Sequence, residues 1–483
     1  MSTAIVVGSG PNGLACAVEL ARNGVSVTVL EAEERIGGGT RTSELTVPGL
    51  LHDDCSATHP MAVGSPFLRS LDLEQHGLEW LWPEIDLAHP LDDGSAGVMV
   101  RSIDETAEGL GEDGRAWRRV FGSASAHFGE LLDDIMRPVL HLPSHPLRLV
   151  RFGLAAAAPA TLLARSWRTP QAKALFGGVA AHAFSPLNRP MSSSVGCALI
   201  SAGHAFGWPV AKGGSGAITD ALASVLRSHG GTIETGRRVT DMAELAGADV
   251  VVFDLAPEAV AEIAGERLPG RVARAYRRYR HGPGAFKLDL AVEGGVPWIN
   301  EACRRAGTVH LIGRFEEIVL AERAVNRGSM AERPYVLVGQ QYLADPGRSE
   351  GDLHPVWAYA HVPSGYGGDA TEAVLGQIER FAPGFRERIV ASSVRGPADI
   401  AAYNANYVGG DIITGANTPM QLLFRPRVAL DPYSCGAPGL YICSAATPPG
   451  AGAHGIGGYN AARSALRHLG ADSRHAPSGG PAQ

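Results

Sequence analysis

The chain has 483 residues, of which 45% are apolar and 19% are charged, and its formal net charge is −7. This balance suits a globular protein with large buried cores in two or three domains, and it excludes a bulk attraction for nucleic acid. Six cysteines without paired spacing argue for reduced thiols in a cytoplasmic setting and against a zinc or other metal site.

The N-terminal segment predicts a dinucleotide-binding unit. Residues 4–7 form an uncharged apolar run, which is typical of a strand buried in a parallel sheet. Gly8, Gly10 and Gly13 then permit a tight turn, a close approach of backbone to a pyrophosphate, and close packing of the next helix. That helix is expected over residues 11–23, and its N-terminus offers N–H groups to an anion.

The next two features favour FAD over NAD. Glu31 follows a second predicted strand, where its carboxylate can accept ribose hydroxyls and would disfavour the 2′-phosphate of NADP. A second glycine turn, GGGTR at residues 37–41, can reach the far side of a longer cofactor. The contacts expected from this half are Gly8, Gly10, Pro11, Asn12, Gly13, Glu31, Ala32, Gly38, Gly39, Thr40 and Arg41.

These motifs, with PGLLHDDCSATHP at residues 48–60, resemble the phytoene desaturase and amine oxidase superfamily. The second segment is similar to the bacterial phytoene desaturase branch related to pyridine nucleotide-disulphide oxidoreductase domain-containing protein 2, although the chain has no redox-active Cys-x-x-Cys. The resemblance implies an α/β fold in which a discontinuous Rossmann-like FAD-binding domain joins an α+β substrate domain. We expect the FAD-binding domain at residues 1–70, 205–285 and 405–470, the substrate domain at 71–204 and 286–404, and a disordered tail at 471–483.

The substrate domain is expected to contain an unusually basic stretch. No Asp or Glu occurs between Asp134 and Asp220, whereas eight Lys and Arg residues do. Within this stretch residues 152–164 are uncharged and apolar, but they are too short and too broken by Pro159 to span a bilayer. The segment could be a quiet helical core, the mouth of an apolar substrate tunnel, or a contact with a membrane surface through the basic 137–212 region.

The middle of the chain supplies further FAD-binding elements. A helix is expected over residues 218–229, followed by a short strand through Ile233. The resemblance implies that the next segment returns beneath the adenine, with a backbone contact from Val239. Another buried strand is expected within residues 248–257, and we interpret its Asp254 as a turn or cap residue. No second G-x-G-x-x-G occurs, so oxygen, a quinone or a protein is the expected electron acceptor rather than a bound nicotinamide.

Lys287 is a candidate catalytic residue. The segment 281–298 resembles the superfamily strand whose lysine holds a water near flavin N5, and Lys287 takes that position. A cation there can assist proton movement and reoxidation of the flavin by oxygen. The alternative is a strand lysine that faces solvent.

Two later segments are candidates for the substrate cavity. Trp357, Tyr359 and His361 alternate along a predicted strand and should share one face, either as a cavity wall or as ordinary packing. The stretch 403–426 resembles the family segment that passes beside the flavin, which implies that Gln421 and Arg425 are cavity neighbours.

The closing motif, residues 439–466, predicts a strand followed by a helix that begins near Gly455. The N–H groups of Gly455 and Ile456 can face the pyrimidine end of the flavin and stabilise its negative charge. Ser444 stands where many superfamily members have an acid, so the contacts to the ribityl chain should differ. No cysteine lies near the expected ring edge, which favours non-covalent FAD.

The same motif bears on the substrate. Amine oxidases usually place an aromatic residue where this chain has residues 451–454, AGAH, so an apolar substrate is favoured over an amine. His59 and His454 lie in segments expected to approach the flavin and are candidates for the catalytic base. The leading hypothesis is dehydrogenation of a C–C bond in a polyene, isoprenoid or related molecule by hydride transfer to flavin N5. A flavin-dependent isomerase or saturase is the nearest alternative, and an isoprenoid-binding escort, as in GDP-dissociation inhibitors, is the alternative from another class.

Overall fold

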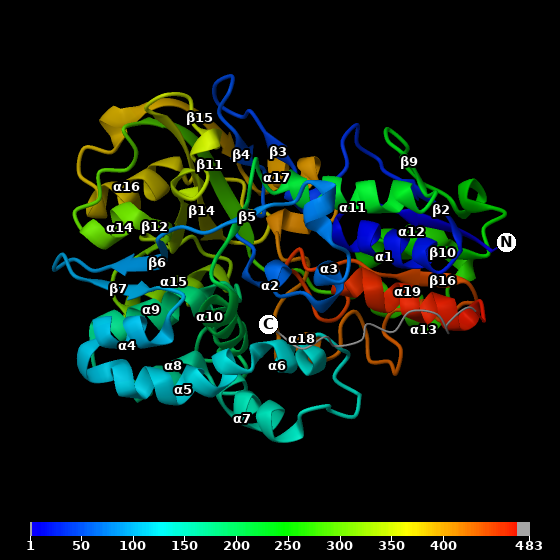
Figure 1. Ribbon diagram of the computed structural model, residues 1–483, viewed down its shortest axis with the longest axis horizontal. Coiled ribbons are helices and arrows are strands. Elements are labelled where there is room, and N and C mark those ends of the chain that lie inside the picture. The colour runs from blue at the N-terminus through cyan, green and yellow to red at the C-terminus, as the bar shows by residue number, and fades with distance from the viewer. Residues whose placement is uncertain (1, 471–483) are drawn as a thin grey trace.

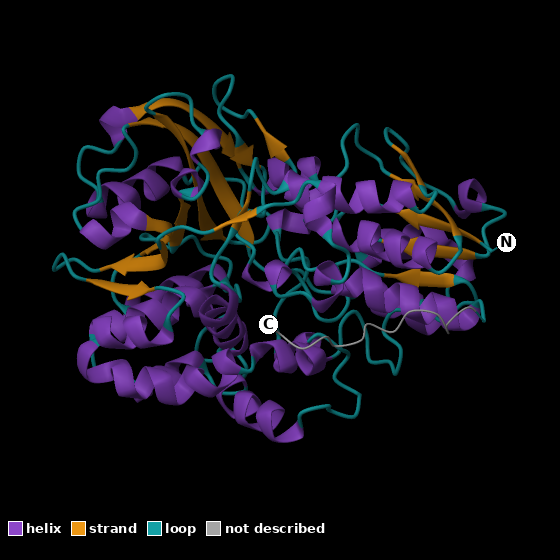
Figure 2. Cartoon of the chain, viewed as in Figure 1, coloured by secondary structure: helices purple, strands orange, loops and turns teal. Residues whose placement is uncertain are grey.

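Two β-sheets lie on opposite sides of the molecule in the computed structural model, which describes residues 2–470 (Figures 1 and 2). The tail that we expect to be disordered lies outside the described residues. The first sheet is parallel, with the strand order β16-β10-β1-β2-β9. Its strands are β1 (Thr3–Val7), β2 (Ser26–Leu30), β9 (Thr232–Glu234), β10 (Val250–Phe253) and β16 (Leu440–Ile442). Numbered in chain order this is 5-4-1-2-3, which is the order of the first five strands of the Rossmann dinucleotide-binding fold.

Helices cover both faces of the parallel sheet, which explains why its strands are apolar on both sides. One face packs on α1 (Pro11–Arg22), α11 (Gly216–Ser228) and α19 (Ile456–His468). The other face packs on α12 (Pro257–Ala264) and α13 (Gly270–Tyr276). Neighbouring strand residues point to opposite faces, so Val6 and Val252 belong to the first core and Val7 and Phe253 to the second.

The two glycine-rich segments meet where α1 packs against α19. A Cβ on Gly458 would lie 1.8 Å from the carbonyl oxygen of Asn12, so only glycine allows these two backbones to approach so closely. The N–H of Gly458 also lies 3.4 Å from Asn12 Oδ1, to which it donates. Segments more than 400 residues apart are thereby locked together, as a shared cofactor site requires.

The second sheet has the order β15-β11-β14-β13-β12-β6-β7 and is antiparallel except between β12 and β6. One face packs on α16 (Thr371–Phe381), and the other packs on α9 (Pro170–Ala181), α10 (Ser194–Phe206) and α15 (Phe315–Val325). Its strands are β6 (Ile85–Pro90), β7 (Ala96–Met99), β11 (Gly284–Glu293), β12 (Ala306–Leu311), β13 (Val336–Gly339), β14 (Leu353–Val362) and β15 (Ile389–Arg395).

The basic stretch of the sequence folds as part of a helical layer below the second sheet (Figure 1). Its core includes buried aromatic residues, among which Phe121 and Trp167 stack with ring centroids 5.9 Å apart. The other helices of this layer are α4 (Ile103–Gly109), α5 (Gly114–Ala126), α6 (Phe128–Ile135), α7 (Pro146–Ala156) and α8 (Ala160–Leu163). Over residues 2–470, no single helix combines the length and apolarity needed to cross a membrane, and α7 with residues 160–166 meets that test only as a pair bent by 93°.

Short elements complete the connections between these layers. They are β3 (Thr42–Ser43), β4 (His52–Asp53), α2 (Pro60–Val63), α3 (Pro66–Arg69), β5 (Trp80–Leu81), β8 (Val210–Ala211), α14 (Glu301–Arg305), α17 (Pro397–Tyr403) and α18 (Pro419–Leu423).

Candidate functional site

One cavity of about 810 Å³ joins the two halves of the fold, a volume in the range of small-molecule and cofactor sites. The first glycine motif, the 37–41 turn and the 444–453 loop line one part of it. Residues of β12, β13, β14 and α10 line another part. The same cavity therefore borders both the predicted dinucleotide site and the second sheet.

The glycine motif brings β1 and β10 together at their carboxyl ends. Gly8 has a positive φ of 102°, and a Cβ there would lie 3.0 Å from the carbonyl oxygen of Asp254. A Cβ on Gly10 would lie 2.7 Å from the Asp254 carboxylate. This is the point at which the strand order of the sheet reverses, where α/β proteins of this topology bind ligands.

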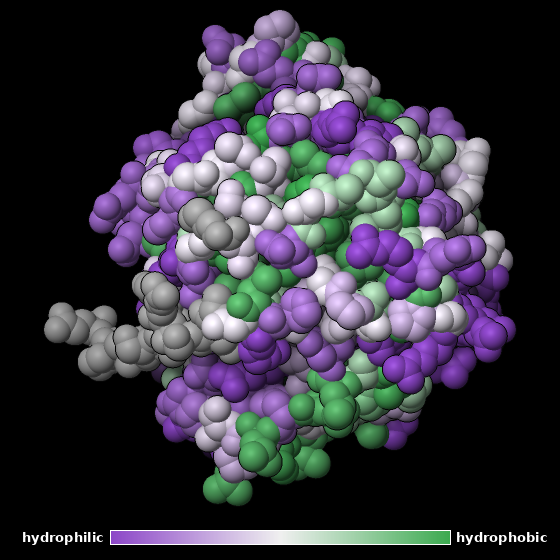
Figure 3. Space-filling view, turned by 90° about the vertical axis from the view of Figure 1, so that its right-hand side faces the viewer, coloured by the Kyte–Doolittle hydropathy of each residue, from purple (hydrophilic) through white to green (hydrophobic). Residues whose placement is uncertain are grey.

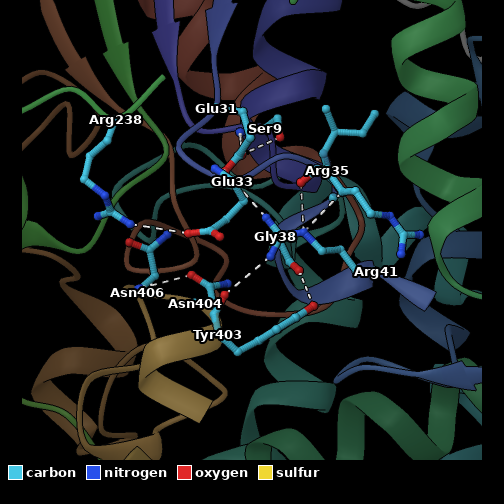
Figure 4. A network of polar contacts seen from close by, with 12 residues as sticks. Ser9, Glu31, Glu33, Arg35, Gly38, Arg41, Arg238, Tyr403, Asn404 and Asn406 are labelled. Atoms are coloured by element: carbon cyan, nitrogen blue, oxygen red, sulfur yellow. Dashed lines mark hydrogen bonds and ion pairs between the residues drawn. The ribbon is translucent and has the colours of Figure 1, made fainter. Parts of the chain in front are cut away.

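Glu31 is held in place by its neighbours (Figure 4). Its buried carboxylate accepts hydrogen bonds from Ser9 N at 2.9 Å, Ser9 Oγ at 2.5 Å and Glu33 N at 2.9 Å. The guanidinium of Arg41 lies 3.5 Å away and donates to Arg35 O at 2.9 Å. The acid predicted to hold the ribose is thus fixed at the cavity wall before any ligand arrives.

The loop of residues 403–407, which begins the stretch expected to pass beside the flavin, closes this end of the cavity. Tyr403 donates its hydroxyl hydrogen to Gly38 O at 2.7 Å, and Asn406 Nδ2 donates to Asp254 O at 3.0 Å. Asn404 Oδ1 accepts from Asn406 N at 3.1 Å (Figure 4). The Asn-x-Asn spacing is a further signal in the sequence, because asparagine side chains readily bond the backbone two residues on.

Asp254 lies at the N-terminus of α1 and lines the cavity. Its Oδ2 accepts a 2.9 Å hydrogen bond from Gly13 N, so it caps this helix from a distant strand. Burial, with a smaller contribution from the nearby Glu31 carboxylate, raises the pKa of Asp254 to about 7, although the hydrogen bond from Gly13 N–H opposes this change. A titrating carboxyl group therefore stands where the pyrophosphate of a dinucleotide is expected.

The loop before α19 forms the part of the cavity wall that comes from the closing motif. Arg425 lines the cavity and donates to Asn417 Oδ1 at 2.8 Å and to Ala445 O at 3.2 Å. Residues 449–453 of this loop line the cavity, whereas Gly455 and Ile456 at the start of the helix do not. The N–H of Ile456 donates to His454 Nδ1 at 3.1 Å.

The predicted site residues divide into two groups. Those that line the cavity are Gly8, Gly10, Pro11, Asn12, Glu31, Ala32, Gly38, Gly39, Thr40, Arg41, Val239, Tyr359, Arg425 and Ser444. Those that do not are Gly13, His59, Lys287, His361, Gln421, His454, Gly455 and Ile456. His361 instead bonds Glu322 at 2.6 Å on the face that it shares with Tyr359, and the Gln421 amide bonds Arg280 and Ala416.

Lys287 is buried in a small pocket beside the main cavity. Its ammonium group forms an ion pair with Asp289 and lies 5.7 Å from the centre of the Trp357 ring. Burial lowers the pKa of Lys287, while the Asp289 carboxylate opposes that change. Trp357 and Tyr359 border both pockets, so Lys287 lies one side chain behind the cavity wall. Its role toward a flavin stays a prediction.

His182 is the histidine that lines the cavity within residues 2–470, and no sequence motif surrounds it. Its Nε2 lies 3.0 Å from His310 Nε2, and burial lowers the pKa of His182 to about 3. The two histidines favoured by the sequence lie outside the cavity lining, with His59 Nε2 2.8 Å from Ser215 Oγ. Burial lowers the pKa of both His59 and His454 to about 4.

Comparisons with known proteins agree with this arrangement. Residues 6–70 match the model of the NAD(P)-binding Rossmann-like domain. The rat (Rattus norvegicus) protein called pyridine nucleotide-disulfide oxidoreductase domain-containing protein 2 is 25% identical over 96% of this chain and 93% of its own length.

Solved structures with the same fold include an oxidoreductase from Methanosarcina mazei, with TM-score 0.64, 16% identity, and coverage of 96% of this chain and 100% of that one. A putrescine oxidase bound to putrescine gives a TM-score of 0.60 and 17% identity over 97% of this chain and 99% of that one. The chain therefore carries a Rossmann-like dinucleotide-binding domain within the α/β fold of these oxidoreductases, and it is distantly similar to the rat protein.

Proposed function

We propose that the protein is an FAD-dependent oxidoreductase that dehydrogenates a C–C bond of a largely apolar substrate. The observation that carries this proposal is the cavity of about 810 Å³, which borders both glycine motifs and the second sheet. A dinucleotide held by the first motif would place its far end toward the 444–453 loop. The resemblance to the phytoene desaturase branch supports the same reading.

The residues present fit FAD. Gly8 and Gly10 let the turn lie against Asp254, which a Cβ would meet at 3.0 and 2.7 Å, and both line the cavity. Glu31 is fixed for a ribose, and the 37–41 turn extends the site beyond one nucleotide. When bound, FAD supplies a two-electron acceptor for an activated C–H bond. Cys55 lines the cavity, but burial raises its pKa to about 11 and keeps it a thiol, which supports non-covalent binding.

The charges around the cavity favour an apolar substrate over an amine. The acids that line it are Glu31, Glu33, Asp254, Glu258 and Glu262, all in the nucleotide-binding half of the chain. The walls formed by α10 and the second sheet carry mainly aliphatic and aromatic side chains, with Thr308 and Gln341 as uncharged polar residues, and, among residues 2–470, no carboxylate. An amine cation would lack a counter-ion there, whereas apolar carbon would gain from leaving water.

His182 is the residue best placed to accept a proton from the substrate. Its imidazole borders the cavity on one side and His310 on the other. The lowered pKa keeps the ring neutral at pH 7, so it has a lone pair that can accept a proton, although as a base it is weaker than an ordinary histidine. The aliphatic and aromatic side chains around it exclude water from the reacting carbon.

The test is anaerobic incubation of the purified protein with lipophilic compounds while flavin absorbance near about 450 nm is followed. Bleaching together with one double bond gained per flavin supports dehydrogenation, and turnover without net double-bond gain indicates the isomerase. A protein that binds no FAD contradicts the proposal and favours the escort. Oxygen, quinone and protein acceptors are compared by their rates of restoring the absorbance.

We also propose that the protein contacts an anionic membrane surface through α7. The apolar side chains of this surface, the α7 patch, point outward at the lower edge of Figure 3, where α7 lies. They are Leu140, Leu142, Leu147, Val150 and Leu154, and the exposed fractions of Leu142 and Leu147 are 92% and 86%.

Two further observations support this surface as a membrane contact. Asp134 accepts hydrogen bonds from Ser144 N and His145 N at 2.7 and 2.9 Å, which fixes the loop before α7 and holds its leucines outward. Exposed Arg137 and Arg151 flank the patch, as anionic headgroups require.

A further inference from the structure

Polar groups without partners are buried in the cavity wall formed by the second sheet. Thr308 on β12, Trp357 on β14 and Gln341 just after β13 all line the cavity and are 1%, 7% and 4% exposed. Thr308 Oγ1, Trp357 Nε1 and Gln341 Nε2 make no hydrogen bond within residues 2–470. Groups of this kind are costly to bury unpaired, so they indicate a polar partner that the chain does not supply.

The strand register explains why these side chains gather. Thr308 lies opposite Gly339, and Gly339 lies opposite Trp357, so the three residues form a row across β12, β13 and β14 on one face of the sheet. A Cβ on Gly339 would lie 2.3 Å from Gln341 Nε2 and 3.1 Å from Trp357 Cε3. Because Gly339 has no side chain, the Gln341 amide and the Trp357 ring can lie directly over its backbone.

The charges nearby restrict what this group of residues can bind. The arginines that line the cavity are Arg41, Arg237, Arg238 and Arg425, which belong to the segments of the dinucleotide site and the closing loop. Lys287, whose ammonium group lies behind the wall near the Trp357 ring, is already paired with Asp289. A carboxylate here would have no free counter-ion, whereas an uncharged oxygen can accept from an amide, an indole or a hydroxyl.

We infer that Thr308, Gln341 and Trp357 form a subsite for an uncharged oxygen function, a carbonyl or a hydroxyl, on an otherwise apolar substrate. This inference rests on the proposed function, because it takes the cavity to be the substrate site. It deepens that function by naming the substrate class: apolar molecules with one uncharged oxygen, rather than pure hydrocarbons, amines or carboxylates.

Four probes of similar size and shape separate these classes: acetophenone, 1-phenylethanol, ethylbenzene and benzoate. Their dissociation constants are measured by calorimetry on the FAD-loaded protein, without turnover. We expect Thr308→Val and Gln341→Met each to weaken the binding of acetophenone or 1-phenylethanol by about three- to tenfold, the effect of one hydrogen bond. Ethylbenzene should change by less than about twofold, because it makes no such bond. Thr308→Ser keeps the hydroxyl and should preserve the wild-type preference.

The inference is overturned if the substitutions weaken ethylbenzene and the oxygen-bearing probes equally, if neither oxygen-bearing probe binds, or if benzoate binds most tightly. Whichever of the ketone and the alcohol loses more affinity identifies the group that the subsite takes. The visible spectrum of the same samples reports FAD separately. A yellow protein that shows no probe discrimination therefore refutes the subsite alone, and a protein without FAD refutes the proposed function.

Discussion

The backbone N–H of Gly13 donates a 2.9 Å hydrogen bond to Asp254 Oδ2, so a carboxyl group from the residue after β10 caps the helix that begins within the first glycine motif. The N-terminus of such a helix normally receives the phosphates of a dinucleotide. Here the capping acid and the incoming anion compete for the same end of α1. The raised pKa of Asp254, about 7, decides how strongly they compete near neutral pH.

We therefore expect FAD to bind more tightly as the pH falls from 8.5 to 6. Because the pKa of Asp254 is raised above its ordinary value, the carboxyl group is neutral below about pH 7 and negative above it, and only the charged form repels the pyrophosphate. Above that pKa the dissociation constant should rise by up to about tenfold per pH unit. Titrating the apoprotein with FAD at each pH, followed by flavin fluorescence, measures this dissociation constant. Asp254→Asn should flatten the profile and tighten binding at pH 8, and an unchanged slope in that variant would show that Asp254 is not the titrating group.

Gly458→Ala should separate the two halves of the FAD site. The added Cβ would meet the Asn12 carbonyl at 1.8 Å, so α19 must move away from α1. We expect a loss of about 1–3 kcal/mol in the free energy of unfolding, together with weakened FAD binding. Gly376→Ala in α16 is the matched control, since its Cβ meets nothing within 4 Å and should stabilise the helix by about 0.5–1 kcal/mol. Denaturant unfolding and flavin content together test the prediction, which fails if both variants behave alike.

His182→Gln should slow reduction of the flavin by substrate by about 10²- to 10⁴-fold, the usual contribution of a positioned base. FAD content should be unchanged, because His182 lines the cavity at the second sheet rather than at the glycine motifs. Stopped-flow reduction under nitrogen measures the rate. His468→Gln changes an exposed histidine of α19 and should have no effect. A similar loss on substituting His59 or His454, with His182→Gln unaffected, would return the role to the residues favoured by the sequence.

Lys287→Met tests the role implied by the superfamily resemblance. If Lys287 assists reoxidation, the substitution should slow the return of oxidised flavin in oxygen and leave reduction by substrate unchanged. The single change also leaves the Asp289 carboxylate buried without its partner, which alone destabilises the fold. The double variant Lys287→Met/Asp289→Asn removes that cost and serves as the control. Slower reduction with normal reoxidation in both variants would contradict the assignment.

Leu147→Asp and Leu154→Asp together should abolish binding to vesicles that contain anionic lipid. Both side chains lie in the exposed α7 patch, so the change removes apolar contact and adds charge that anionic headgroups repel. Sedimentation with phosphatidylglycerol-containing vesicles and with neutral phosphatidylcholine vesicles measures the binding. Leu320→Asp, at an exposed leucine of α15 outside the patch, is the control. Wild-type protein that stays in the supernatant, or dimerises through the patch instead, would contradict the membrane contact.

Local sequence determined the dinucleotide-binding half of this protein. Residues 3–31 contain a strand, a glycine turn, a helix, a second strand and an acid, and each depends on residues close by in the sequence. For that reason β1, α1, β2 and Glu31 lie where the sequence pattern predicts them. The closing strand and helix were predictable for the same reason, and so was the alternation that puts Trp357 and Tyr359 on one face of β14.

Tertiary structure determined which side chains meet around the dinucleotide-binding half. Asp254 meets Gly13 across 241 positions, and Thr308, Gly339 and Trp357 form a row only because three strands pair in one register. His182 reaches the cavity from a helix with no motif around it, while Lys287 is drawn behind the wall by Asp289. Such contacts depend on which distant segments pack together, and on the burial that follows, neither of which local patterns encode.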